Sequence, residues 1–132
     1  MRENWLSRFI GALLVLGLFS SSACANTQSS MGLIKMPPGF SIEVFASAPG
    51  ARSIAVSPEL GVVFVGSKNE SVFAISFKDG KSLSSWHLKG GLRVPHGVAW
   101  RDGYLYVGEQ HRITRYRGDS LQALANAEPQ TI

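Results

Sequence analysis

The chain has 132 residues, a formal net charge of +4 at pH 7 and a single cysteine. One cysteine excludes an intramolecular disulfide framework, so the fold must be held together by packing. The basic residues are spread thinly, and their one cluster is Arg112, Arg115 and Arg117 on a single expected strand. This distribution favours a solvated outer strand over nucleic-acid binding.

The first 25 residues are typical of a secretory signal peptide. Arg2 and Arg8 precede an eleven-residue apolar run, residues 9–19, and Ala23-Cys24-Ala25 provides a small-residue exit. The apolar run is too short to span a bilayer. We therefore expect cleavage after Ala25 and a periplasmic or secreted protein that lacks a stable membrane span.

Cys24 has a second interpretation, as the acylated first residue of a lipid-anchored protein. Such sites usually carry leucine three positions before the cysteine, and Ser21 stands there instead. Ordinary cleavage is the favoured interpretation, and lipid anchoring through Cys24 stays open as the alternative. Loss of Arg2, Glu3 and Arg8 with the signal would lower the net charge to +3.

The segment that follows the signal predicts a flexible leader over residues 26–39, because it is polar and small and ends in Pro37-Pro38-Gly39. Residues 40–46 then alternate apolar and polar side chains. Alternation of this kind indicates a half-exposed strand, which we expect at a sheet edge or as a closing strand.

The most informative feature is an internal repeat of short strands. Expected strands at 53–56, 62–67 and 71–75 are echoed at 97–100, 104–109 and 112–116. Counted between equivalent apolar residues, the offsets are 44, 42 and 41 residues. A repeat of about 40–50 residues built from short strands is typical of a β-propeller blade. The predicted fold is therefore all-β.

The repeat divides residues 40–132 into a first blade at about 52–90 and an incomplete second blade at about 93–132. Residues 83–88 are expected to form the fourth strand of the first blade, residues 119–127 a short helix, and residues 128–132 the start of another fourth strand. Two blades cannot close a ring, so we expect the first part of a larger propeller domain. The uncovered faces of an isolated fragment should make it self-associate.

Four segments, at residues 34–46, 49–58, 63–66 and 95–107, resemble in order and spacing the glucose/sorbosone dehydrogenase family. The resemblance extends from about residue 34 to residue 116. It implies a secreted six-bladed propeller that oxidises a small-molecule sugar. It also implies pyrroloquinoline quinone at the mouth of the central channel, with a calcium ion that polarises the quinone.

Sugar oxidation requires a base that takes the hydroxyl proton while hydride passes to the quinone. In sorbosone-type members the base is a histidine in a His-Gly motif just after the outer strand of the second blade, and the chain ends before that point. Neither His87 nor His111 is followed by glycine, and Pro95-His96-Gly97 matches a different family position, the loop leading into the second blade. We therefore predict no catalytic residue and an inactive fragment, with a base role for His96 as the weaker alternative.

In a propeller, the loops that lead into each innermost strand and those that join the second and third strands open on one face. Lys68, Asn69 and Gln110 lie on such loops. So do the predicted cofactor-binding residues, which are Arg52, Arg93, His96, Glu109 and Arg112. An arginine there could pair with the carboxylates of the quinone. The competing interpretation is that these residues are ordinary loop charges.

The sequence leaves a second function open, a non-catalytic secreted propeller module that binds or scaffolds, because one fold supports many activities. It contains no glycine-rich phosphate loop, no paired-cysteine metal site and no nucleophile elbow. Five aromatic residues recur at strand periodicity and are expected to pack as blade core: Trp86, Trp100, Tyr104, Tyr106 and Tyr116.

Overall fold

The computed structural model describes residues 31–132. The chain divides into two units, residues 1–41 and 42–132. The described part of the first unit contains a short 3-10 helix, Met31–Leu33, and a turn in which the Phe40 N–H donates to the Pro37 carbonyl over 3.2 Å. The predicted signal peptide and Cys24 lie outside the described residues.

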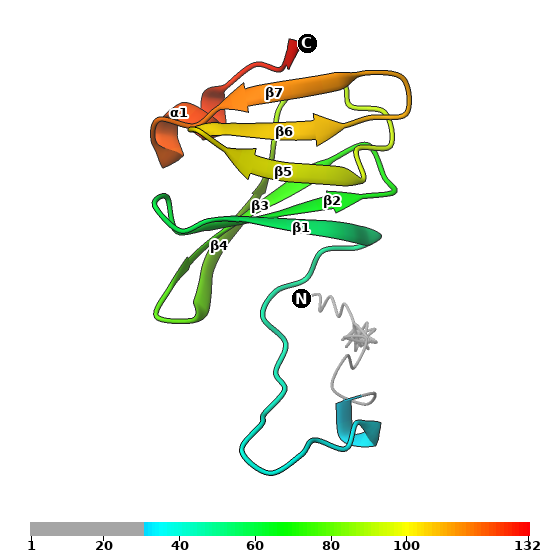
Figure 1. Ribbon diagram of the computed structural model, residues 1–132, viewed down its shortest axis with the longest axis vertical. Coiled ribbons are helices and arrows are strands. Elements are labelled where there is room, and N and C mark those ends of the chain that lie inside the picture. The colour runs from blue at the N-terminus through cyan, green and yellow to red at the C-terminus, as the bar shows by residue number, and fades with distance from the viewer. Residues whose placement is uncertain (1–30) are drawn as a thin grey trace, which may run out of the picture. The chain divides into compact units, whose positions relative to one another are not determined.

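The second unit contains two four-stranded antiparallel sheets, each a simple meander (Figure 1). The first sheet consists of β1 (Ala51–Ser57), β2 (Val62–Ser67), β3 (Val72–Lys78) and β4 (Lys81–His87). The second consists of β5 (Gly97–Arg101), β6 (Tyr104–Gly108), β7 (Ile113–Arg117) and β8 (Gln130–Thr131), with the helix α1 (Leu121–Asn126) between β7 and β8. The prediction of a mainly β structure is confirmed.

Aspartate–glycine pairs close two hairpins, one in each sheet. Asp79 and Gly80 have φ of 50° and 75°, and Asp102 and Gly103 have the same two values. Two successive positive φ angles define the tight turn whose twist matches that of the flanking strands, and Asp-Gly tolerates it best. The turn residues therefore set the register where each hairpin begins; β5 and β6 keep it throughout, whereas the register of β3 and β4 shifts between Ser76 and Phe77.

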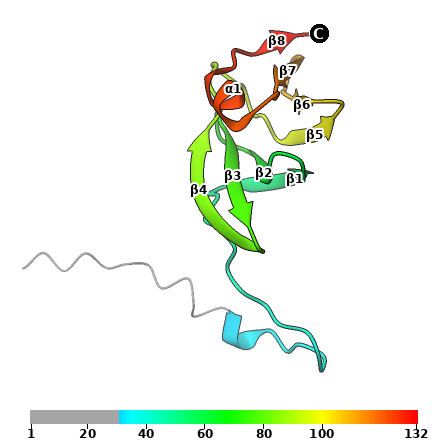
Figure 2. The ribbon, with the colours of Figure 1, turned by 90° about the vertical axis from the view of Figure 1, so that its left-hand side faces the viewer.

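The main core lies between the two sheets, which Figure 2 shows one above the other. Phe64 of the first sheet is fully buried, and its ring stacks on Trp100 of the second with centroids 5.5 Å apart. Gly118 permits this packing, because a Cβ atom there would lie 2.5 Å from the Trp100 ring. The remaining buried members of this core come from both sheets, from the segment between β4 and β5, and from α1: Val62, Val72, Ala74, Leu88, Leu92, Leu105, Val107, Tyr116 and Leu124.

The expected strand at residues 40–46 is absent. Residues 42–48, here called the strap, form no strand pairs and pack against the first sheet through Ala46 and Ala48. The Phe45 carbonyl accepts a hydrogen bond from the Ser82 hydroxyl over 2.7 Å, and the Phe45 ring lies edge-on to Phe77 with centroids 6.3 Å apart. The prediction of a strand at residues 40–46 is therefore wrong. Alternating side chains are not sufficient, because a strand also requires a partner edge in register.

Other boundaries shift slightly. The fourth strand expected at 83–88 is β4, Lys81–His87, and the helix expected at 119–127 is α1, Leu121–Asn126. Ser120 caps α1 by accepting the Ala123 N–H over 3.1 Å. Among residues 31–132, no helix has the length and apolar character required to cross a membrane.

Candidate functional site

Loops from both sheets meet at one end of the second unit, where β1 and β5 begin and where β2 and β6 end (Figure 1). The Ser67 N–H donates to the Pro95 carbonyl over 3.1 Å, which joins the end of β2 to the loop before β5. The Gln110 N–H donates to the Arg93 carbonyl over the same distance, which joins the loop after β6 to that same segment. The backbone therefore brings three loops into contact at this end.

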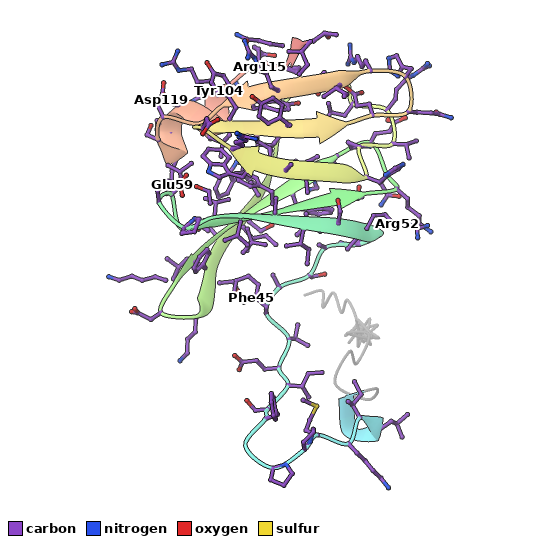
Figure 3. The ribbon with its side chains drawn as sticks, in the orientation of Figure 1. Phe45, Arg52, Glu59, Tyr104, Arg115 and Asp119 are labelled. Carbon is purple, nitrogen blue, oxygen red and sulfur yellow. The ribbon has the colours of Figure 1, made fainter. Side chains whose placement is uncertain are left out.

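A shallow open groove of about 330 Å³ lies at this end and is lined by Arg52, Lys68, Val94 and His96. Figure 3 shows Arg52 at the beginning of β1. The groove thus combines two permanent cations with an imidazole, and no carboxylate lines it. Such a concentration of positive charge attracts anions.

The loop that carries His96 is held firmly against β2. A Cβ atom on Gly66 would lie 2.6 Å from the His96 carbonyl oxygen, so only glycine allows this approach. The Ser53 hydroxyl donates to that same carbonyl and accepts the Val98 N–H over 3.2 Å. The position of the His96 backbone is therefore set by contacts with both β1 and β2.

Val94 has a strained backbone, with φ of 48°. A β-branched residue in the left-handed region is a genuine outlier, and strain of this kind persists only where surrounding contacts enforce it. The His96 N–H donates to the Val94 carbonyl over 2.9 Å, which closes a tight turn around Pro95. The strained turn places Val94 and His96 side by side in the groove lining.

Beside the segment that carries Val94 and His96, Glu109 and Arg112 form an ion pair. The Glu109 side chain is fully buried, and its Oε1 accepts from Arg112 Nε over 2.7 Å while its Oε2 accepts from the Arg93 backbone N–H over 2.7 Å. Burial raises the pKa of Glu109, but the hydrogen bonds from Arg112 and Arg93 outweigh this effect and leave its pKa below the ordinary 4.5. Glu109 is therefore ionised and connects the loop after β6 with the loop before β5.

The structure thus separates the five predicted cofactor-binding residues into two groups. Arg52 and His96 line the groove together. Glu109 and Arg112 are engaged with each other, and the exposed Arg93 contributes its backbone N–H to them. Val94 and Ser53 were missed by the sequence, since neither a positive φ at valine nor a hydroxyl in a strand carries a recognisable signal.

The three histidines have different surroundings. The His87 ring packs on Phe73 with centroids 4.5 Å apart, and His111 is exposed in the loop between β6 and β7. Within residues 31–132, no hydrogen bond joins the His96 ring to another side chain. The same residues contain no group of three His, Cys, Asp or Glu side chains that could hold a metal ion.

Comparison of the chain with protein-family models, curated proteins and solved structures finds no match in any of the three. The resemblance to the glucose/sorbosone dehydrogenases therefore rests on the sequence segments given above. What the structure adds is a mainly β unit of two four-stranded meanders with a cationic groove at one end.

Proposed function

We propose that the two sheets are consecutive blades of a β-propeller and that the groove binds a small ligand bearing carboxylates. Both sheets have the same strand order, and equivalent residues pair in the same register. Val56 pairs with Val63 in the first sheet, and their equivalents Trp100 and Leu105 pair in the second. A shared topology and a shared register support descent of both sheets from one repeated unit.

The single observation that carries the ligand proposal is the groove lined by Arg52, Lys68 and His96. Guanidinium groups bind carboxylates through paired hydrogen bonds, and an ammonium group adds a point charge. Pyrroloquinoline quinone is a planar ring system with carboxylates, so Arg52 and Lys68 would hold its acidic edge. When bound, the quinone supplies an acceptor for the hydride of a sugar hydroxyl carbon.

The described residues fit the carboxylates of the quinone but not a calcium ion, because calcium requires several oxygen ligands and no cluster of acidic side chains is present in residues 31–132. On this proposal, the chain belongs to a quinone-dependent sugar dehydrogenase of the glucose/sorbosone type and supplies two blades and part of the cofactor pocket. A non-catalytic propeller module that binds an anionic ligand is the alternative. The absence of a described side-chain partner for the His96 ring favours it, since a base is normally oriented by a second group.

The proposal is tested by titrating the purified chain with pyrroloquinoline quinone and following tryptophan fluorescence. Saturable binding should weaken by about tenfold in Arg52→Ala and in Lys68→Ala, because each change removes a charge-assisted contact. Arg101→Ala is the matched control, as this exposed arginine lies at the opposite end of β5. Absence of saturable binding, or equal affinity in wild type and Arg52→Ala, would contradict the proposal.

Dye reduction with glucose or sorbosone separates the two candidate functions. We expect binding of the quinone without turnover by this chain, even with calcium added, because the described residues provide neither an oriented base nor a calcium site. Quinone-dependent turnover that disappears in His96→Ala would contradict this expectation. It would assign the base to His96 after all.

A further inference from the structure

The repeat relates the outer face of the second sheet to the buried face of the first. With offsets of 42 residues between β2 and β6 and 41 between β3 and β7, each buried position of the first sheet has an equivalent in the second. Val62, Phe64, Val72 and Ala74 are fully buried against the second sheet; their equivalents are Tyr104, Tyr106, Ile113 and Arg115. The outer face of the second sheet is therefore equivalent to the face of the first sheet that packs against a neighbouring sheet.

That outer face is aromatic and cationic and is only partly covered. Ile113 is 50% exposed, the Tyr104 and Tyr106 rings lie 6.4 Å apart, and the Arg115 guanidinium lies 4.6 Å from the Tyr104 ring centre. Figure 3 shows Tyr104 and Arg115 together on this sheet. Tyrosine and arginine are the residues that interfaces between proteins concentrate.

The first sheet carries the complementary half of the same contact. In the second sheet, Val98 and Trp100 of β5 pack toward the first sheet, and their equivalents in β1 are Ile54 and Val56. Ile54 is 67% exposed and Val56 45% exposed. The strap covers other parts of this face, where Ala46 and Ala48 pack against Val65, Phe73 and Ile75, and leaves the side chains of β1 open.

We propose that the outer face of the second sheet docks onto the β1 side of the first sheet in a second copy of this chain, and so repeats the contact between the two sheets. Within one chain the most extensive contact between the sheets is that of β1 with β5. Between chains, β5 of one copy would lie on β1 of the next. The stack of Phe64 on Trp100 has Tyr106 and Val56 as its equivalents, so these two residues should meet across the new interface.

The repeat identifies the partner of these exposed faces as a second copy of the chain. Each chain presents both halves of an interface that it already forms once internally, and both halves carry exposed apolar side chains at the required positions. The contact is heterologous, because two different faces meet, so it generates a ring or an open stack of copies. It rests on the repeat and not on the ligand of the groove, so quinone binding and self-docking succeed or fail independently.

Cysteine cross-linking tests the register. In a Cys24→Ser background, chains with Val56→Cys are mixed with chains carrying Tyr106→Cys and are oxidised gently. We expect disulfide-linked pairs in the mixture and none in either sample alone. Links that form equally in the Tyr106→Cys sample alone would mean that like faces meet, and no link in the mixture would mean that the faces do not meet; either result overturns the proposal. Ala99→Cys, on the exposed outer face of β5, replaces Tyr106→Cys if that variant does not fold.

Sedimentation of the full chain tests the association itself. Ile54→Lys and Ala99→Lys change exposed residues, one on each face, and each should weaken association by more than about tenfold because the new ammonium group would be buried in a contact that already contains the Arg115 guanidinium. Gln122→Lys, exposed on α1, is the control and should associate as the wild type does. A monomeric wild-type chain, or association that neither face variant weakens, would overturn the proposal.

Discussion

The two sheets share one register, but the side chains at equivalent positions hold the loops at the ends of β2 and β6 in different ways. Ser67 ends β2, and Glu109 follows β6 at the equivalent position, 42 residues later. The buried Ser67 hydroxyl donates to the Ser71 carbonyl over 2.7 Å and accepts the Asn69 N–H over 3.2 Å, so it closes its own loop. Glu109 instead reaches the Arg93 backbone in another loop.

This difference shows where the groove obtains its rigidity. The side chain at the end of β2 acts locally, whereas the side chain after β6 connects its loop to the segment that carries Val94 and His96. A change at Glu109 should therefore reach the groove, and a change at Ser67 should affect stability alone. Five substitutions and a pH dependence test the comparison of equivalent positions.

The largest effect is expected at Phe64. Phe64→Ala should lower the free energy of unfolding by about 3–5 kcal/mol, because it leaves a cavity between the sheets beneath Trp100. Its equivalent, Tyr106, is only partly buried, so Tyr106→Ala should cost about 1 kcal/mol in dilute solution. Urea unfolding of both variants measures the difference. Equal losses would mean that the outer face of the second sheet is as deeply packed as the core.

Glu109→Ala should have the next largest effect, about 2–4 kcal/mol, because it leaves the Arg93 N–H and the Arg112 guanidinium without their acceptor. The same variant should weaken quinone binding, because the tie to the loop before β5 is lost. Glu109→Gln keeps an acceptor oxygen and should lose clearly less stability. If Glu109→Ala binds the quinone as the wild type does, Glu109 does not position the groove.

Ser67→Ala should cost about 1 kcal/mol, since it removes the hydroxyl that links Asn69 and Ser71. The Ser67 backbone N–H still donates to the Pro95 carbonyl, so the groove keeps its support. Quinone affinity should remain at the wild-type value, in contrast to Glu109→Ala. A parallel loss of affinity would remove the distinction between the two positions.

The strands and turns were predictable because they depend on local chemistry. Short runs rich in apolar and aromatic residues define β2, β3 and β6, the repeat locates β7, and each Asp-Gly pair marks the turn of one hairpin. The repeat then gave the correspondence between the sheets. Residues 40–46 were predicted wrongly as a strand, since alternation identifies a strand-forming segment but not the edge with which it pairs.

The candidate site was predictable only as a location. The sequence placed Arg52, His96, Glu109 and Arg112 at one end of the sheets, but residue type does not reveal which charges already have partners. Glu109 and Arg112 neutralise each other, while Arg52 has no ion-pair partner within residues 31–132. Burial and pairing depend on the packing of distant loops, which spacing along the chain does not encode.

The smallest effect is expected from acid, because a protonated Glu109 keeps a carbonyl oxygen that can accept one of its two hydrogen bonds. The pKa of Glu109 is lowered in the folded chain, so the stability it provides is complete above about pH 5 and is lost as the pH falls through the lowered pKa. Ser67 does not titrate, so the first sheet has no equivalent dependence at this position. Unfolding free energies of wild type and Glu109→Gln, measured as the pH is lowered, should converge, because the variant lacks this ionisation while the other acidic groups titrate in both. A constant difference between the two proteins down to the acid limit would mean that the Glu109 carboxylate does not carry the tie between the loops.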